Sequence, residues 1–231
     1  MKDKILEGLN PQQKAAVEHL GSPLFVSAGA GSGKTKVLTH KIAYLVKEKG
    51  LRPHRILAIT FTKKAANEML DRIVRILAIK PMWISTFHSF CVKVLREDVH
   101  KLGKLFNRSF VIYDTTDSLR VLKDILKRFN IDTKESGDAR DVISKAKQSY
   151  RSSIFDYISA LPYPASSYAD VAEAYREALE RSNAMDYDDL IYFAVELLST
   201  NPEIRAKWQG RFDHILIDEF QDTNDIQFSL I

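Results

Sequence analysis

The chain has 231 residues, of which 45% are hydrophobic and 28% charged, a composition that excludes disordered and fibrous proteins. No apolar run approaches the roughly 18 residues that a membrane span requires, and the start of the chain lacks the apolar core of a signal peptide. Cys91 is the only cysteine, which excludes a disulfide framework and a cysteine-built metal site and favours a cytoplasmic location.

The net charge of +4 is unevenly distributed along the chain. Residues 1–119 hold 20 Lys and Arg against 10 Asp and Glu, whereas residues 186–231 hold 3 against 10. A polyanion-binding face beside a metal-binding carboxylate cluster is one arrangement that gives this distribution. Two ends that complement each other when packed would give the same pattern.

Helix and strand signals alternate in the first half of the chain. Asn10 and Thr62 have the form of N-caps, Gly50 that of a C-cap, and apolar residues recur at helical spacing after Thr62. These signals predict helices over residues 11–20, 33–49, 62–77 and 86–98. Short apolar runs predict strands over residues 24–28, 55–60, 82–85 and 110–112.

The pattern changes after residue 114. Strand signals vanish, and helices are predicted over about 115–129, 137–152 and 166–182. A further helix (186–199) and an apolar strand (213–218) follow. Because alternating strands and helices indicate a parallel sheet, we predict an α/β fold. Its main domain comprises residues 1–113 and 186–231, and an all-helical subdomain, residues 114–185, is inserted into it.

A glycine-rich segment follows the first predicted strand and opens a predicted helix: Ala28, Gly29, Ala30, Gly31, Ser32, Gly33, Lys34 and Thr35. That context is typical of a nucleoside-triphosphate phosphate loop. Backbone amides and the helix N-terminus would surround the β- and γ-phosphates, Lys34 would reach their oxygens, and Thr35 would coordinate Mg²⁺. The alternative is a glycine-rich turn with an incidental Gly-Lys-Thr.

Two carboxylates end the last predicted strand. Asp218 and Glu219 follow an apolar run, and ligands of parallel sheets gather at the carboxyl ends of strands. We therefore predict that Asp218 holds Mg²⁺ and that Glu219 acts as the general base that activates the attacking water. An acidic loop or helix start is the alternative.

Several segments, in the same order, resemble the UvrD/PcrA/Rep group of superfamily 1 DNA helicases, an α/β, RecA-like P-loop NTPase family. They are residues 9–13, 28–35, 59–69, 84–90, 186–190 and 218–224 with Gln227. The resemblance implies that Gln13 reads the adenine edge and that the phosphate loop opens with Ala28 as it does in the family. The segment 186–190 carries Tyr187 where the family usually has phenylalanine, and a tyrosine ring still stacks on a base.

The same resemblance implies contacts with single-stranded DNA. The residues concerned are Thr60, Phe61, Thr62, Thr86, Phe87, His88 and Tyr187. Aromatic rings offer faces on which bases stack, and hydroxyls offer hydrogen bonds to phosphates. Alternatives remain for most of them: Phe61 and Phe87 are suited to a core, Thr62 and Thr86 to helix caps, and His88 to a structural role.

Other conspicuous residues have less definite roles. Cys91 lies in an apolar helical stretch and is expected to be buried and inert, and Trp83 and Trp208 are expected in a core or an interface. Basic residues of the predicted insertion form either a duplex-facing surface or an ordinary solvated helix face: Lys123, Lys127, Arg128, Arg140, Lys145, Lys147 and Arg151.

The resemblance implies a motor that couples ATP hydrolysis to DNA unwinding in repair or replication. ATP and Mg²⁺ are its expected cofactors, single-stranded DNA and DNA junctions its partners, and a monomer its expected state, with no membrane. The family's later motifs and second motor domain are missing, so we expect an N-terminal piece that binds nucleotide weakly and scarcely hydrolyses it. The alternatives are the motor part of an AddA/RecB-type helicase-nuclease and a non-motor, nucleotide-regulated single-stranded DNA-binding module.

Overall fold

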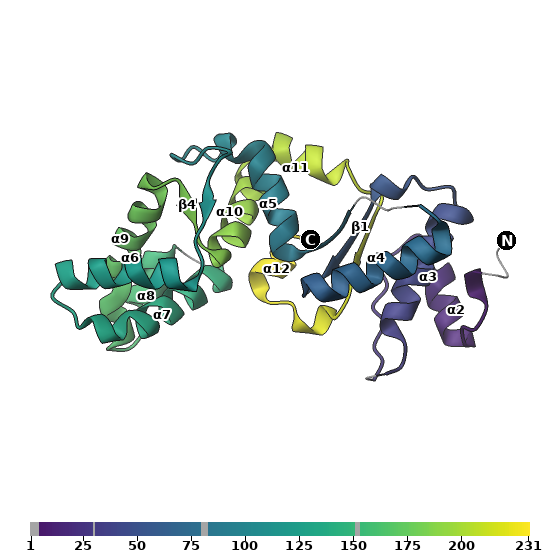
Figure 1. Cartoon of the computed structure of the whole chain (residues 1–231), viewed down its shortest axis with the longest axis horizontal. Coiled ribbons are helices and arrows are strands. Elements are labelled where there is room, and N and C mark those ends of the chain that lie inside the picture. Colours follow the sequence, from purple (N-terminus) through teal and green to yellow (C-terminus); the bar gives the residue numbers. More distant parts are fainter. Residues whose placement is uncertain (1–4, 30, 80–82, 151–152) are drawn as a thin grey trace. The chain divides into compact units, whose positions relative to one another are not determined.

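The computed structural model describes residues 5–29, 31–79, 83–150 and 153–231, and Figure 1 shows its elements. The chain forms two compact units. Unit 1 comprises Met1–Phe87 and Lys207–Asp222, and unit 2 comprises His88–Ala206 and Thr223–Ile231. The domain boundaries expected from sequence lie elsewhere, after residues 113 and 185, because they follow the change in element type. Ala30, Met82 and Arg151, which belong to sequence predictions, lie outside the described residues.

Unit 1 contains a parallel sheet, as predicted, but it has three strands, because the predicted strands 24–28 and 110–112 do not belong to it. The strand order is β2 (Trp83–Thr86), β1 (Ile56–Thr60) and β5 (His214–Ile217). Every residue of the central strand β1 is buried, which explains its unbroken apolar sequence. The strands are in register at their ends, with Thr60 opposite Thr86 and Ile59 opposite Ile217. The residues that follow the three strands therefore share one edge of the sheet.

The helices of unit 1 begin at the residues that the sequence predicts. Asn10 and Gln13 form a capping box at the start of α2 (Pro11–Glu18), and the Thr62 hydroxyl accepts a hydrogen bond from the Ala65 amide at the start of α4 (Lys63–Leu77). Helix α3 (Lys34–Lys47) begins directly after Gly33. Short 3₁₀ turns occupy Pro53–Arg55 and Phe220–Asp222.

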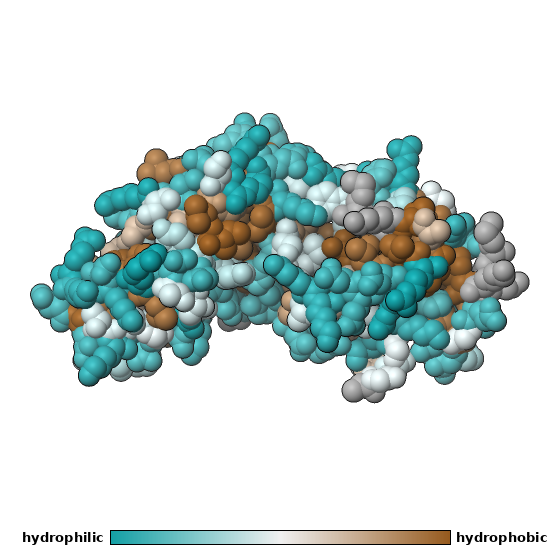
Figure 2. Space-filling view, viewed as in Figure 1, coloured by the Kyte–Doolittle hydropathy of each residue, from teal (hydrophilic) through white to brown (hydrophobic). Residues whose placement is uncertain are grey.

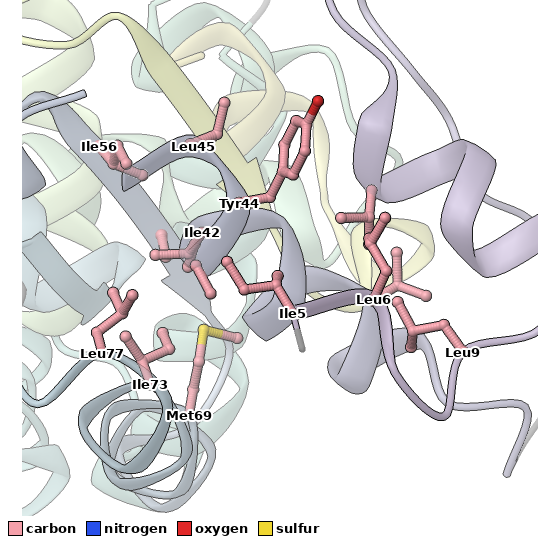
Figure 3. Close-up of a cluster of buried hydrophobic side chains, with 14 residues drawn as sticks. Ile5, Leu6, Leu9, Ile42, Tyr44, Leu45, Ile56, Met69, Ile73 and Leu77 are labelled. Atoms are coloured by element: carbon pink, nitrogen blue, oxygen red, sulfur yellow. The ribbon is translucent and has the colours of Figure 1, made fainter. Parts of the chain in front are cut away.

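The core of unit 1 is formed by helices α3 and α4 against β1. Figure 3 shows Ile42 of α3, Ile56 of β1 and Ile73 of α4 converging. Met69 and Leu77 lie on the same face of α4 as Ile73, and all three are no more than 1% exposed. The spacing of four residues between them is the apolar stripe of an amphipathic helix, so the sequence pattern of α4 dictates its packing.

The predicted strand 24–28 is wrong in this structure. Among the described residues, none of its backbone groups joins the sheet, and the side chains of Leu24, Phe25 and Val26 are 39–67% exposed. An apolar run indicates a strand only where a neighbouring strand pairs with it. Here the segment forms no hydrogen-bonded ladder with a strand, and Phe25 contacts Phe220 edge to face at 6.0 Å.

Unit 2 is mainly helical, as predicted for most of it. Its elements are α5 (Phe87–Asp98, which begins at the last residue of unit 1), Val99–Lys101 (3₁₀), β3 (Val111–Ile112), α6 (Thr115–Arg128), Thr133–Glu135 (3₁₀), α7 (Ser136–Ser149), α8 (Ile154–Ser159), Ala165–Tyr168 (3₁₀), α9 (Ala169–Arg181), β4 (Ala184–Met185), α10 (Tyr187–Thr200), α11 (Pro202–Gln209, which ends in unit 1) and α12 (Asp225–Ser229). The short elements α8, α11, α12 and β4 were not predicted. Strand β3 pairs with β4 in a separate two-stranded parallel sheet.

The core of unit 2 lies between α6, α7 and α9, with Leu122, Ile143 and Tyr175 all buried. Cys91 of α5 is fully buried, as predicted, and burial raises the pKa of its thiol well above the ordinary value. Hydrophilic side chains cover most of the face shown in Figure 2, with apolar ones gathered in patches. Within the described residues, no helix is both long and apolar enough to cross a membrane.

Candidate nucleotide site and nucleic-acid interface

The glycine-rich loop of unit 1 turns sharply into α3. Gly31 and Gly33 have φ angles of +75° and +88°, a left-handed conformation that side chains other than glycine adopt at a cost. A Cβ atom at Gly33 would also lie 3.0 Å from the side-chain nitrogen of Gln13. Both glycines are therefore required by the backbone. The turn brings the first amides of α3 to the loop, and a helix N-terminus of this kind suits an anion.

Lys34 is the first residue of α3, and its side chain folds back over the loop. Its Nζ donates to the carbonyl oxygen of Ala28 at 2.9 Å and lies 3.5 Å from that of Gly29. The ammonium group is thus held where a phosphate bound in the loop would meet it. Phosphate oxygens are stronger acceptors than these carbonyls because they carry charge.

Thr35 and Asp218 are 183 positions apart in sequence and in contact in unit 1. The Thr35 hydroxyl donates to Asp218 Oδ2 at 3.1 Å, and the Asp218 amide donates to the Ile59 carbonyl at 2.9 Å, which continues the pairing of β1 and β5. The pKa of the Asp218 carboxyl lies above its ordinary value. Burial and the charge of Glu219 raise this pKa, and the hydrogen bond from Thr35 lowers it by less.

A hydroxyl and a carboxylate oxygen are the hard donors that Mg²⁺ accepts, and Mg²⁺ in nucleotide sites takes its remaining ligands from water and phosphate. Thr35 and Asp218 therefore fit the predicted ion. Elsewhere in the described part of the chain, no group of three or more His, Cys, Asp or Glu side chains is arranged to hold a metal.

Glu219 follows Asp218 in an unusual backbone conformation. Its φ angle is +52°, in the left-handed region that favours glycine. The side-chain nitrogen of Gln221 donates to Glu219 Oε2 at 2.5 Å. This hydrogen bond orients the carboxylate. Sequence reasoning included Gln221 in a family segment but assigned it no role. The signal available was its spacing, two residues from the glutamate across a tight turn.

Gln13 lies beside the phosphate loop. Its side-chain nitrogen donates to the Ser32 carbonyl at 2.9 Å, and its side-chain oxygen accepts from the Asn10 amide at 3.0 Å. The capping box of α2 thus fixes the residue predicted to read adenine. A cavity of about 800 Å³ adjoins Lys34, Asp218 and Glu219, and it extends between residues 19–26, α3 and β5.

Five residues predicted to contact DNA follow or end strands β1 and β2 in unit 1. Thr60 is fully buried, and its hydroxyl donates to the Thr62 carbonyl at 3.0 Å. Thr86 and Phe87 are 6% and 2% exposed. Phe61 is half-buried and meets Phe87 edge to face at 5.6 Å. Phe61 and the exposed cap residue Thr62 are thus the accessible members of this set.

The other two predicted DNA contacts belong to unit 2. Tyr187 is 55% exposed, and its ring meets that of His88 edge to face at 5.6 Å. Burial lowers the pKa of His88, against the raising effect of the Asp188 charge. A neutral imidazole offers one donor and one acceptor, so this pair combines an exposed stacking surface with a hydrogen-bonding group.

Lys147 of α7 lies neither on a duplex-facing surface nor on a solvated helix face, the two alternatives that sequence reasoning offered for it. Its side chain is 3% exposed, and its Nζ lies 2.7 Å from both Asp186 Oδ2 and Asp189 Oδ1. Burial lowers the pKa of Lys147, but the charges of the two carboxylates raise it by more. The pKa of Lys147 therefore lies above its ordinary value. The sequence did contain a signal: Lys147 falls on the helical face of Ala139 and Ile143, which are buried.

A family model described as the UvrD/REP helicase N-terminal domain matches residues 9–231. Similar curated proteins are the ATP-dependent DNA helicase PcrA of Bacillus subtilis (strain 168), 44% identical over 236 residues, and that of Staphylococcus aureus (strain Mu50), 41% identical over 231 residues. A probable DNA helicase II homolog of Mycoplasma capricolum is 41% identical over 238 residues.

These alignments cover 98–100% of this chain and 31–32% of each relative. The chain thus spans about a third of the length of the curated relatives that it matches. Three observations point to the same family: the order of the sequence motifs, the Thr35–Asp218 contact, and the match over nearly the whole chain. The chain belongs to the UvrD/REP helicase N-terminal domain family.

Proposed function

We propose that this chain binds ATP and Mg²⁺ at the phosphate loop and single-stranded DNA at the carboxyl edge of the sheet and at Tyr187, as the N-terminal part of an ATP-dependent DNA helicase. The Thr35–Asp218 hydrogen bond carries the nucleotide half of this proposal, because it joins the phosphate loop to the acidic strand end. The names of the relatives support the helicase half. They do not favour a helicase-nuclease or a non-motor binding module.

Each residue of the nucleotide site has a separate task in the proposal. Lys34 and the loop amides bind the phosphates, Thr35 and Asp218 hold Mg²⁺, and Gln13 contacts the base. Mg²⁺, when bound, neutralises phosphate charge. Glu219, oriented by the Gln221 amide, takes the proton of the attacking water. The backbone of the proposed phosphate loop before Lys34 is formed by Ala28, Gly29, Ala30, Gly31, Ser32 and Gly33.

The DNA half of the proposal uses accessible groups first. Phe61, Thr62, His88 and Tyr187 are the candidates for direct contact, since the described structure leaves part of each side chain accessible. Thr60, Thr86 and Phe87 complete the predicted set as buried neighbours. Single-stranded DNA and DNA junctions are the proposed partners, together with a second motor domain of the same protein, and the proposed state is a monomer.

The proposed architecture is a RecA-like motor domain, residues 1–113 and 186–231, interrupted by a helical subdomain, residues 114–185. The parallel sheet with the phosphate loop and the acidic strand end at its edge supports the RecA-like assignment. The continuous run of helices between β3 and β4 supports the insertion, since those two short strands pair with each other where the run begins and ends.

Titration with a fluorescent ATP analogue, with and without Mg²⁺, tests the nucleotide site. We expect Lys34→Ala to weaken binding by about 10- to 100-fold, because a charge-assisted hydrogen bond to phosphate is lost. Asp218→Asn should abolish the Mg²⁺ dependence. Lys47→Ala, at the exposed other end of α3, is the matched control and should bind normally. Unchanged affinity and Mg²⁺ dependence in Lys34→Ala would show that the phosphate-loop assignment is wrong.

A further inference from the structure

A buried lysine of helix α7, Lys147, forms ion pairs with two aspartates in the first turn of α10. We propose that Lys147 is a positioning residue for single-stranded DNA binding: it fixes the first turn of α10 in the conformation that presents Tyr187. The inference rests on the proposed DNA-binding role of Tyr187 and adds a residue that touches neither DNA nor nucleotide.

Four carboxylate oxygens in this turn all have partners. Asp186 is the N-cap of α10 and Asp189 its third residue, and they form a capping box: the Asp189 amide donates to Asp186 Oδ1 at 2.9 Å, and the Asp186 amide donates to Asp189 Oδ2 at 3.1 Å. Lys147 Nζ lies 2.7 Å from each of the two remaining oxygens. Tyr175 also donates to Asp186 Oδ2, at 3.1 Å. Neither aspartate can rotate without breaking one of these bonds.

The third carboxylate of the turn is held by the neighbour of Lys147. The Gln148 side-chain nitrogen donates to Asp188 Oδ1 at 3.0 Å. Helix α7 thus contacts every acidic residue in the first turn of α10 and leaves Tyr187 as its exposed member, at 55%. Because Tyr187 lies between Asp186 and Asp188, its backbone is fixed on both sides.

The lysine is not needed to begin a helix. Helix α6 starts with the same Asp-x-x-Asp capping box, formed by Asp114 and Asp117, and its cationic partner is Arg120, 70% exposed, at 2.8 Å. Taking an ammonium group and two carboxylates out of water is costly. Helix initiation does not require this cost, so the buried ion pairs point to a different role. The residue that lies between the anchored Asp186 and Asp188 is Tyr187, the proposed stacking residue.

A preorganised ring binds more tightly than a mobile one, because the cost of ordering it has been met during folding. If Lys147 acts through Tyr187, its loss weakens stacking without touching the phosphate loop. This separates a positioning role from a general structural role, which would affect both ligands.

The test uses the 231-residue chain and a single-stranded oligonucleotide containing 2-aminopurine. Stacking quenches the fluorescence of this base, and the signal measured is the quenching that follows binding to the chain. We expect Tyr187→Ala to weaken binding by about 5- to 150-fold, the range for one stacked base. Lys147→Met should weaken binding by about 5-fold or more and reduce the 2-aminopurine signal, but should have no further effect in the Tyr187→Ala background. Affinity for the ATP analogue should be unchanged. Arg120→Met is the matched control and should bind DNA normally.

The outcomes separate this inference from the proposed function. If Tyr187→Ala binds DNA normally, the proposed role of Tyr187 is wrong, and the role of Lys147 falls with it. If Tyr187→Ala weakens binding and a folded Lys147→Met does not, the proposed function stands and the inference is overturned. Additive losses in the double variant would also overturn it.

A second variant covers the case in which Lys147→Met fails to fold. In Lys147→Met/Asp186→Asn/Asp189→Asn no charge is left unpaired, and asparagine remains a good helix cap. Circular dichroism should show a folded chain, and the 2-aminopurine signal should still be reduced, because the ion pairs of Lys147 that join α7 to α10 are gone. A wild-type signal in this folded variant would overturn the inference.

Discussion

The helices α6 and α10 of unit 2 begin with the same sequence pattern in different surroundings. Both have aspartate at the N-cap and at the third position, and in both the two residues form a reciprocal capping box. In α6 the box is exposed and Arg120 is its cation. In α10 the box is buried and its cation is Lys147, from another helix.

The difference shows that a local motif and its energetic weight are separate properties. A capping box contributes about 1 kcal/mol wherever it occurs, and an exposed ion pair adds less than that. Once buried, the same carboxylates depend on their cation, because neither charge can return to water unless the structure opens. The sequence motif of α10 is therefore ordinary, whereas its context makes it a point of high stability and low tolerance.

The largest expected difference between the two boxes concerns their cations. Lys147→Met should lower the free energy of unfolding by about 3–5 kcal/mol, because two buried carboxylates lose their cation, whereas Arg120→Met should change it by less than about 1 kcal/mol. Urea unfolding followed by circular dichroism measures both. Equal effects would show that burial of the α10 box is energetically unimportant.

The comparison also shows what the sequence predicts well. The start of α4 at Thr62, the capped start of α2 after Asn10 and the buried strand β1 follow from signals within a few residues. Lys147 was misplaced because its partners lie 39 and 42 positions later, beyond any local pattern. Residues 24–28 were misassigned for a similar reason, since an apolar run does not specify whether a neighbouring strand pairs with it.

A smaller contrast is expected for the N-cap residues themselves. Asp114→Ala should cost about 1 kcal/mol, the usual value for a lost cap. Asp186→Ala should cost about 3 kcal/mol, because Lys147 and Tyr175 lose a buried acceptor as well. The same unfolding experiment compares them. An Asp186→Ala cost no larger than that of Asp114→Ala would remove the energetic distinction between the boxes.

The smallest expected effect is a pH dependence in the buried box. Burial and the charge of Asp186 raise the pKa of Asp189, against the lowering effect of Lys147, and Tyr192 also faces this carboxyl. Because its pKa is higher in the folded chain than in the unfolded one, ionisation of Asp189 reduces stability as the pH rises through its folded pKa.

Asp189→Asn removes that ionisation, so the substitution should be better tolerated at about pH 8 than at about pH 4. Urea unfolding at the two pH values, with Asp117→Asn of the exposed box as the baseline, measures the effect. A stability difference between Asp189→Asn and wild type that does not vary with pH would contradict this sign.

The candidate nucleotide site was largely predictable because its residues come from contiguous motifs. The sequence predicted that Thr35 and Asp218 share one site, since strand ends of a parallel sheet meet at one edge. It could not predict that Gln221 orients Glu219 or that Lys34 rests on the carbonyls of its own loop. Both depend on side-chain rotamers that are set by the folded backbone.

The backbone at Glu219 shows how keeping one side chain at a position can lower the stability of the turn that carries it. Its backbone lies in the left-handed region at φ +52°, where a residue with a Cβ carries strain on the order of 1 kcal/mol. Glycine would relieve the strain but has no carboxylate. Selection for thermal robustness alone would therefore move this position away from glutamate, and a chain that keeps the acid accepts a less stable turn together with a carboxylate at the end of β5.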